Sequence, residues 1–331
     1  MKIYWILSLI IILVLLIYAV TGVYNYRHMF FFGKKGSGKV YRAQRLHIHK
    51  TGELKRHVYY LAETIGERSV FHYKNLEQTA QYIETELSKN DIDYQIQTFK
   101  IKNVPYKNIY VKKEGLNSDA GAIIVGAHYD TIMGTPGADD NASAVAVLLE
   151  LIKQFKSVKT NHPMIFVFFT LEEPPSFGDS KMGSHIFARA LRKKNEKVHF
   201  MISLEMLGFY SERKIQEYPS PILEHTYPKK GNFIAVVGTH EYGVVTNEFY
   251  ENFSRNISFN AEILIAPASL PGVDFSDHRS FWAHDYPAFM ITDTAFYRNK
   301  NYHKKTDTPG TLNYKKMNNI LNGLYLTFKE M

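Results

Sequence analysis

The chain alternates between short apolar runs and segments in which apolar residues recur every three or four positions. A short apolar run bounded by turn residues is typical of a buried strand, and the three-to-four spacing is typical of an amphipathic helix. The pattern predicts strands over residues 93–101, 104–112, 122–126, 163–170, 198–204, 232–238, 263–266 and 288–292. It predicts helices over residues 54–65, 75–87, 143–155, 183–191, 244–253, 276–282 and 313–329. Because strands and helices alternate, we expect a three-layer α/β/α fold with a mostly parallel central sheet.

The N-terminal segment differs from the rest of the chain. Residues 3–23 carry no charge and are mostly Ile, Leu, Val, Trp and Tyr. A run of about 20 such residues is long enough to span a bilayer, and aromatic residues at both ends are typical of interfacial anchors. We therefore expect a transmembrane helix over residues 1–25, a linker over residues 26–50, and one globular domain over residues 51–331. A cleaved signal peptide is the alternative, but the run is long for one and offers a poor cleavage site.

The composition excludes several classes of site. The chain of 331 residues has no cysteine, so disulfides, thiolate zinc sites and a cysteine nucleophile are excluded. The formal net charge is +8, which can indicate a nucleic-acid partner or an anionic membrane. Because Lys and Arg are dispersed and form no basic stripe with interleaved aromatic residues, we expect no nucleic-acid partner. The sequence carries no signal for an oligomeric state.

The most informative stretch spans residues 122–143. Its apolar run ends at His128, Asp130 follows, and a turn rich in Gly leads to Asp139 and Asp140 at the start of the next predicted helix. Open α/β sheets bind ligands at such strand ends. For this stretch alone, a satisfied core histidine followed by helix-capping aspartates is the alternative.

Polar side chains also follow the later apolar stretches of the chain. They are Glu172, Glu173, Glu205, Asp277, His278 and His303. A carboxylate directly after a buried strand is expensive to desolvate unless a cation neutralises it. Histidines combined with a majority of carboxylates suit zinc or a similar divalent ion, and two ions about 3.5–4 Å apart can share a bridging carboxylate.

These motifs resemble those of the M28 family of zinc aminopeptidases. The matching segments are residues 126–131 (Gly-Ala-His-Tyr-Asp-Thr), residues 137–143 (Gly-Ala-Asp-Asp-Asn-Ala-Ser), Glu172 with Glu173, Gly183 with Ser184, Glu205, and His303 with residues 306–309 (Thr-Asp-Thr-Pro). The resemblance covers roughly residues 55–331. It implies the phosphorylase/hydrolase-like zinc-peptidase fold and removal of N-terminal residues from peptides with a free N-terminus.

The resemblance also implies a role for each residue. The expected zinc ligands are His128 and Glu205 for one ion, Glu173 and His303 for a second ion, and Asp140 as the bridge between them. Glu172 would be the general base that takes a proton from water. The residues expected around the ligands are Asp130, which would orient the imidazole of His128, and Asp277 and His278. The family often has a cis peptide bond after the bridging aspartate, which here is the bond between Asp140 and Asn141.

The sequence departs from the common family pattern in two places that bear on the site. Glu205 stands where many members have Asp, and the longer side chain could alter occupancy of that metal position. Residues 174–182 form a longer insertion than in simple members, so the rim of the pocket is not predicted.

Two other functions remain open on the sequence. Glutaminyl cyclases share the fold and use one zinc, which would be held by Asp140, Glu173 and His303. A binding ectodomain without metals is the second alternative, and it predicts missing ligands. For the membrane anchor, the basic residues after it favour a cytoplasmic domain, whereas the frequent export of the family favours an extracytoplasmic one, which is the orientation we expect.

Overall fold

The computed structural model describes residues 49–331. The anchor expected over residues 1–25 and nearly all of the linker expected over residues 26–50 lie outside the described residues. Between residues 49 and 331, no helix combines the length and the apolar character needed to cross a bilayer.

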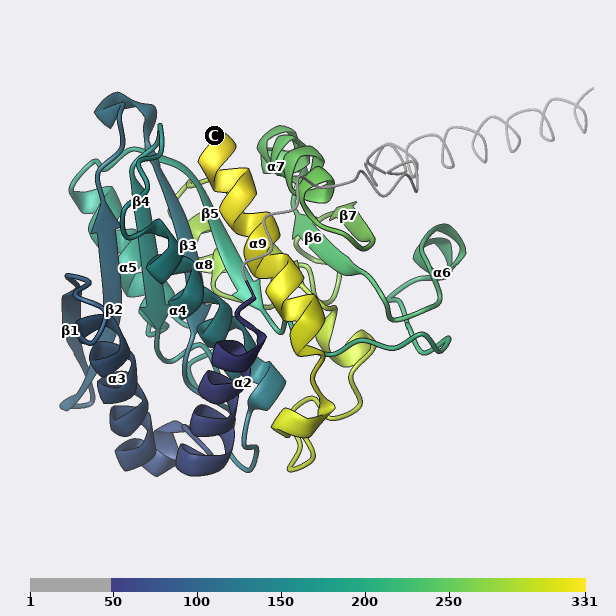
Figure 1. Ribbon diagram of the computed structural model, residues 1–331, viewed down its shortest axis with the longest axis horizontal. Helices are drawn as coiled ribbons and strands as arrows, with labels where there is room; N and C mark the ends of the chain where they lie inside the picture. The colour runs from purple at the N-terminus through teal and green to yellow at the C-terminus, as the bar shows by residue number, and fades with distance from the viewer. Residues whose placement is uncertain (1–48) are drawn as a thin grey trace, which may run out of the picture.

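One mixed sheet forms the centre of the fold (Figure 1). Within the described residues it has eight strands, in the order β1-β2-β4-β3-β5-β8-β6-β7. Their bounds are β1 (Gln95–Ile101), β2 (Val104–Lys113), β3 (Ala122–His128), β4 (Met164–Phe169), β5 (Val198–Glu205), β6 (Ile234–Gly238), β7 (Ala261–Ile265) and β8 (Ala288–Thr292). All of the strands expected from the apolar pattern are therefore present.

The sheet is less parallel than we expected. The central strands β4, β3, β5 and β8 are parallel, whereas β1 pairs with β2, β2 with β4, and β6 with β8 in antiparallel fashion. The first two strands form a hairpin whose turn residues, Lys102 and Asn103, have positive φ, and a hairpin makes its strands antiparallel. Strand β6 follows β5 through residues 206–233, which contain only one short helix, so no helical crossover returns the chain in the parallel direction.

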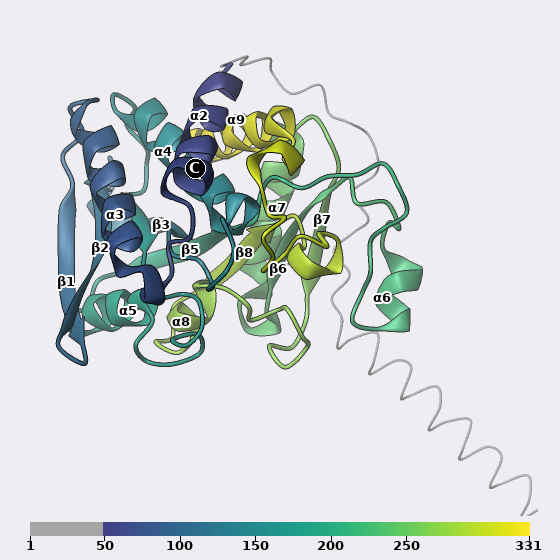
Figure 2. The same ribbon diagram turned by 90° about the horizontal axis from the view of Figure 1, so that it is seen from below.

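Helices cover both faces of this sheet (Figures 1 and 2). One face carries α2 (Thr51–Tyr59), α3 (Tyr73–Ser88), α4 (Ala144–Phe155), α7 (Gly243–Asn256) and α9 (Tyr314–Glu330). The other face carries α5 (Gly183–Lys193), α8 (His278–Trp282) and the connection that contains α6 (Pro221–Thr226). The three-layer prediction is confirmed. Helix α6 was not predicted, because its six residues are too few to show a helical period.

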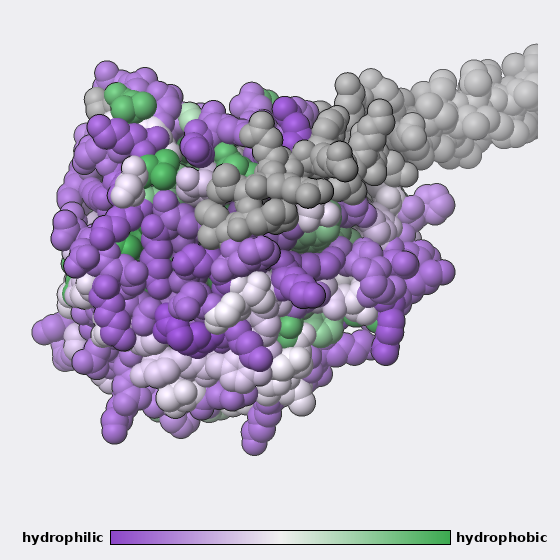
Figure 3. All heavy atoms as spheres, in the orientation of Figure 1, coloured by the Kyte–Doolittle hydropathy of each residue, from purple (hydrophilic) through white to green (hydrophobic). Residues whose placement is uncertain are grey.

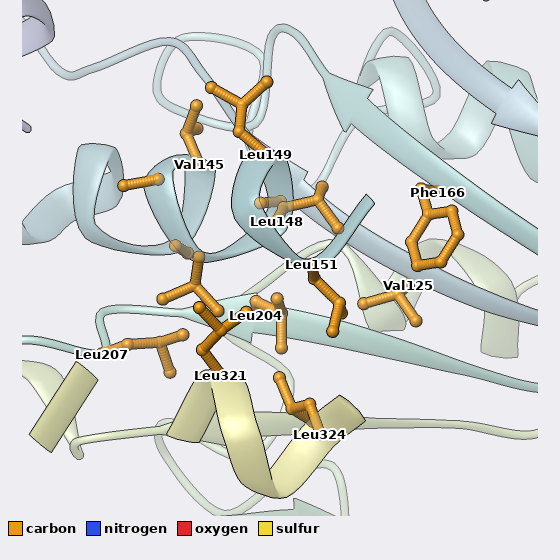
Figure 4. Close-up of a cluster of buried hydrophobic side chains, with 14 of the residues drawn as sticks. Val125, Val145, Leu148, Leu149, Leu151, Phe166, Leu204, Leu207, Leu321 and Leu324 are labelled. Carbon is orange, nitrogen blue, oxygen red and sulfur yellow. The ribbon is translucent and has the colours of Figure 1, made fainter. Parts of the chain in front are cut away.

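The largest core lies between the sheet and the helices of the first face. Figure 4 shows side chains of α4 and α9 meeting beside Leu204 of β5. Helix α4 is buried on all sides over most of its length, since it is enclosed by the sheet, α2 and α9, and this explains its almost continuous apolar sequence. The helix therefore holds a fixed position for the residues that precede it, which include Asp140.

The outer surface of these helices is mainly polar. Figure 3 shows this face as largely hydrophilic, with apolar residues in small separate patches. Scattered apolar residues of this kind are normal on a protein surface and mark no site among the described residues that this view shows.

Candidate metal centre

The parallel central strands bring the predicted ligands to one edge of the sheet. His128 is the last residue of β3 and Glu205 the last residue of β5. Glu172 and Glu173 follow the end of β4, which lies beside β3 with Phe169 opposite His128. Parallel strands end at a common edge, so residues far apart in the sequence meet there (Figure 1).

A first group of possible ligands consists of His128, Asp140 and Glu205. The Nε2 atom of His128 lies 3.4 Å from Oδ1 of Asp140 and 3.3 Å from Oε2 of Glu205. All of these side chains are buried. The longer Glu205 side chain, which departs from the Asp of many family members, therefore reaches this group.

A second group consists of Asp140, Glu173 and His303. The Nε2 atom of His303 lies 3.2 Å from Oδ2 of Asp140 and 3.4 Å from Oε2 of Glu173. Asp140 thus faces one group with each of its carboxylate oxygens, which is the arrangement a bridging ligand needs. The peptide bond between Asp140 and Asn141 is cis, as the resemblance implied.

These distances fit zinc. Two atoms that are each about 2.0–2.2 Å from one tetrahedral zinc ion lie roughly 3.3–3.6 Å apart, and the imidazole-to-carboxylate distances in both groups are 3.2–3.4 Å. Within the described residues, Oε1 of Glu173 is buried and has no hydrogen-bond partner. A buried carboxylate oxygen without a donor is costly, and a cation at this position would remove that cost.

The electrostatics of the centre also call for cations. Burial raises the pKa of Glu173 to about 7, and the negative charge of Asp140 adds to the effect. Burial would lower the pKa of His303, but its hydrogen bonds with Asp140 and Glu173 outweigh burial and raise the pKa to about 10. Burial would raise the pKa of Asp140, but hydrogen bonds with His128 and His303 lower it. The carboxylates outnumber the imidazoles, so divalent ions would neutralise the excess negative charge.

Glu172 lies beside both groups and is a member of neither. Its Oε2 atom is 3.9 Å from Nε2 of His128. Burial raises the pKa of Glu172 well above its usual range, and the charges of Glu173 and Glu205 add to the rise. A buried carboxyl with high proton affinity next to a metal centre has the properties of a general base.

Asp130 supports the site in a way that differs in part from our expectation. Its carboxylate accepts hydrogen bonds from the main-chain N–H groups of Glu172, at 3.2 Å, and Glu173, at 3.1 Å. The Nδ1 atom of His128 lies 3.2 Å from the main-chain oxygen of Asp130 and 3.6 Å from its carboxylate. The imidazole is therefore oriented mainly by the backbone of Asp130, while the carboxylate positions the two glutamates.

Asp277 and His278 have different surroundings. Asp277 is fully buried, and neither of its carboxylate oxygens has a hydrogen-bond partner among the described residues. Burial raises its pKa to about 7, and the positive charge of His128 opposes the rise. His278 donates from Nε2 to the main-chain oxygen of Val273 at 2.8 Å and contacts Trp282 edge-on. Asp277 therefore borders the metal centre, whereas the contacts of His278 lie within its own loop and helix.

Residues 129–143 form the metal loop, and two buried residues that hold this loop were not singled out from the sequence. Arg68 donates hydrogen bonds to main-chain oxygens that include those of Tyr129 and Gly137, so it fixes both ends of the turn. The carboxylate of Asp307 accepts from the main-chain N–H groups of Asp139 and Asp140. Asp307 lies in the motif that follows His303, but its sequence position alone gave it no role.

Other supports join the metal loop to the end of β5. Asn141 donates to the main-chain oxygen of Leu204 at 2.9 Å and accepts from the main-chain N–H of Met206 at 2.9 Å. The hydroxyl of Ser276 donates to Oε2 of Glu205 at 2.7 Å. These contacts place Asp140 and Glu205 at a fixed distance from each other.

A third cluster, Glu53, His57 and Glu150, also contains atoms close enough to hold an ion. Glu150 is instead paired with protein cations: Lys153 lies 2.8 Å away and Lys50 lies 3.2 Å away. His57 uses Nε2 for Glu150 and Nδ1 for the hydroxyl of Tyr82. The cluster is therefore an ion-pair network between helices, and it needs no metal.

Comparison with known proteins identifies the family. The model of peptidase family M28 matches residues 108–327. The uncharacterized protein YfbL of Escherichia coli is 40% identical over 281 residues, which are 82% of this chain and 85% of YfbL. The aminopeptidase YwaD of Bacillus subtilis is 33% identical over 125 residues, which are 37% of this chain and 27% of YwaD.

Solved structures share the fold at low sequence identity. The zinc aminopeptidase BSAP of Bacillus subtilis matches with a TM-score of 0.64 and 15% identity, over 85% of this chain and 96% of BSAP. A glutaminyl cyclase of Fimbriiglobus ruber matches equally well, with a TM-score of 0.64 and 18% identity, over 85% of this chain and 95% of the cyclase. These structures show the fold, and they do not distinguish aminopeptidase activity from glutaminyl cyclase activity. The family model covers most of the chain, and the chain therefore belongs to peptidase family M28.

Proposed function

We propose that this chain is a zinc-dependent aminopeptidase that hydrolyses the first peptide bond of peptides with a free N-terminus. Membership of family M28 makes it a metallo-hydrolase that acts on peptide bonds. The proposal adds two ions per chain, the exopeptidase specificity and the roles of individual residues. The observation that carries it is the position of Asp140, whose two oxygens face two separate ligand groups.

The residues of the centre have separate proposed roles in metal binding and proton transfer. His128 and Glu205 would hold one ion, Glu173 and His303 the other, and Asp140 both. Bound zinc lowers the pKa of water to about 7 and polarises a carbonyl group. Glu172 takes the proton of the attacking water at its carboxylate and passes it to the leaving amine, because it is buried beside the ligand groups and is a member of neither.

The carboxylates also suit the substrate. A free α-ammonium group carries a positive charge, and the site presents four carboxylates, of Asp140, Glu172, Glu173 and Glu205, against two imidazoles. An internal peptide bond carries no such positive charge. Two divalent ions would balance the charge of these four carboxylates, so the preference for an N-terminus would come from carboxylate oxygens that accept hydrogen bonds from the ammonium group.

Cyclisation of N-terminal glutamine on a single zinc is the second candidate. The buried, unpartnered carboxylate of Asp277 beside the centre is the observation that favours it, since such a group could take and return a proton. The complete first group, in which His128 lies 3.3 Å from Glu205, favours hydrolysis with two ions. A binding protein without metals would have lost ligands, and both groups here are complete.

A direct assay separates these functions. We expect the purified full chain, loaded with zinc, to release the first residue from an unblocked peptide and to leave the N-acetylated peptide intact. A chelator should abolish the activity, and added zinc should restore it. Pyroglutamate as the main product from a peptide that begins with Gln would favour the cyclase, and a zinc-loaded chain inactive on every peptide would favour a binding protein.

We also propose that the domain is attached to a membrane and faces away from the cytoplasm. The uncharged stretch over residues 3–23 supports attachment. The orientation is supported only by the frequent export of the family, and the basic residues that follow the stretch argue against it.

A further inference from the structure

A pocket opens beside the metal centre. Its lining includes Glu205, a metal ligand, and Tyr302, whose ring stacks on His303 at 3.6 Å. The space that it encloses, including its open mouth, is about 810 Å³. The pocket therefore begins where the N-terminal residue of a bound peptide would lie.

The floor of the pocket is a row of residues across four neighbouring strands. Glu205 of β5 pairs with Thr292 of β8, Thr292 pairs with Ala235 of β6, and Ala235 pairs with Glu262 of β7. Directly paired residues point to the same face of a sheet, and all four line the pocket. A second carboxylate thus stands at the far end of the row that begins at the metal ligand Glu205.

The length of this row suits a long side chain. Neighbouring strands are about 4.8 Å apart, so three steps place the Cα atoms of Glu205 and Glu262 roughly 14 Å apart. An extended arginine side chain reaches about 7 Å from its Cα by ordinary bond lengths, and a hydrogen bond adds about 3 Å. A substrate residue whose α-ammonium group lies near Glu205 can therefore bring a cation at the end of its side chain to Glu262. A leucine side chain is shorter and ends among the apolar residues in the middle of the pocket.

The walls fit a cation on an apolar stem. Aromatic rings that line the pocket include Tyr218, Phe233 and Tyr297, which can pack against methylene groups and attract a cation. Among the described residues that line the pocket, none is Lys, Arg or His. Arg298 does not line the pocket but packs on the ring of Phe233, 4.5 Å from its centroid. The negative carboxylate of Asp293 balances the positive charge of Arg298.

We infer that this pocket receives the side chain of the N-terminal residue and that Glu262 makes the site select arginine and lysine. The inference rests on the proposed aminopeptidase function. It goes beyond that function because an apolar pocket alone would select leucine or phenylalanine, whereas a carboxylate at the far end adds an ion pair with a long basic side chain.

Arginine and citrulline give the sharpest test in the unmodified protein. Citrulline has the same length and stem as arginine but carries no charge. With the full zinc-loaded chain and p-nitroanilide substrates, we expect kcat/KM for arginine to exceed that for citrulline at least about tenfold, because hydrogen bonds to charged groups are the stronger ones. Equal values for the two substrates would overturn the inference.

Variants then assign the effect to Glu262. In Glu262→Gln the arginine-to-citrulline ratio should fall about tenfold, with zinc content and thermal unfolding measured on the same sample to verify folding. Glu248→Gln makes the same change of charge on an exposed position of α7 outside this pocket and should leave the ratio unchanged. An unchanged ratio in a folded, zinc-loaded Glu262→Gln chain would overturn the role of Glu262. A loss caused instead by Glu217→Gln would do the same, because Glu217 is the remaining carboxylate of the lining besides Glu262 and the metal ligand Glu205.

Different assay results would refute the arginine specificity and the proposed aminopeptidase function. Cleavage of leucine and phenylalanine substrates with no preference for arginine over citrulline refutes only the specificity. No cleavage of any aminoacyl substrate by the zinc-loaded chain refutes the aminopeptidase function itself.

Discussion

Glu172 and Glu173 are adjacent in the sequence but differ in their surroundings. Glu173 lies 3.4 Å from His303 and belongs to a ligand group, whereas Glu172 lies 3.9 Å from His128 and belongs to none. Asp130 holds the N–H groups of both residues, so the pair is presented in a fixed orientation. The different roles that we propose for the two glutamates thus follow from where the backbone directs each side chain.

Removing the proposed base tests this division of roles. Glu172→Gln should lower kcat about 100- to 10,000-fold, because an amide cannot accept the proton of water. Zinc content should stay at the value of the unmodified chain, since Glu172 is not expected to bind metal. Turnover near the normal rate in a zinc-loaded variant would show that another group acts as the base.

The residues behind the ligands should control zinc affinity. Asp307→Asn replaces a carboxylate that accepts two main-chain N–H groups of the metal loop. We expect zinc affinity to fall about 10- to 100-fold, measured by competition with a chelator, because groups that orient ligands have effects of this size. Asp119→Asn, on the exposed surface, is the matched control. Unchanged affinity in Asp307→Asn would mean that the loop keeps its position without this contact.

The candidate ligands could be named from the sequence, whereas most of the residues that support them could not. His128 and Glu205 end apolar strands, so their cost of burial indicated a metal. Arg68 contacts residues 61 and 69 positions away, and Ser276 contacts Glu205 from 71 positions away. No local pattern marks such contacts, because they arise only when the strands and loops are assembled.

At the scale of elements, apolar periodicity identified the strands and long helices but not their directions. Strand β6 reads as an ordinary buried strand, and only the connection before it, without a crossover helix, makes it antiparallel to β8. That reversal brings Ala235 beside Thr292 and creates the floor of the pocket. The pocket was therefore beyond prediction from periodicity, since it depends on strand order and register.

The ion-pair network between α2, α3 and α4 should stabilise α4, the helix that follows the metal loop. Burial alone would raise the pKa of Glu150, but hydrogen bonds from His57 and Lys153 outweigh it and lower the pKa to about 2. Glu150→Gln leaves buried partners without their charge, so we expect a loss of about 3 kcal/mol of unfolding free energy at pH 7. The substitution Glu53→Gln changes a half-exposed carboxylate on the same network and should cost less than about 1 kcal/mol.

The pH dependence of this loss has a definite sign. The pKa of Glu150 is lower in the folded chain than its unfolded value of about 4.3, so the stabilisation is present above that value and is lost as the pH falls toward 2. The difference between the unmodified chain and Glu150→Gln in urea unfolding should therefore shrink below about pH 4.3. A difference that stays constant with pH would contradict the assigned ion pairs.

At the scale of the whole molecule, the catalytic domain is expected to be held at a membrane by its N-terminal segment. We expect the full chain to remain with membranes after a high-salt or carbonate wash, because an apolar span of about 20 residues is not released by salt. Deletion of residues 1–25 should release the activity into the soluble fraction. Full-length chain in the soluble fraction, or a mature N-terminus after residue 25, would contradict the anchor.

Sidedness needs its own measurement. A protease added to intact cells or right-side-out vesicles should digest the domain if it faces away from the cytoplasm. Protection until the membrane is permeabilised would place the domain on the cytoplasmic side, which the basic residues after the span favour.

The whole account depends on two ions meeting at Asp140, and zinc stoichiometry tests it most directly. Zinc should be measured by mass spectrometry on the purified full chain after dialysis, beside Asp140→Ala and the surface control Asp119→Ala. The account predicts about two zinc ions per unmodified or control chain and little or none in Asp140→Ala, because both groups lose their shared ligand. One ion in the unmodified chain, or full zinc retention in folded Asp140→Ala, would contradict it.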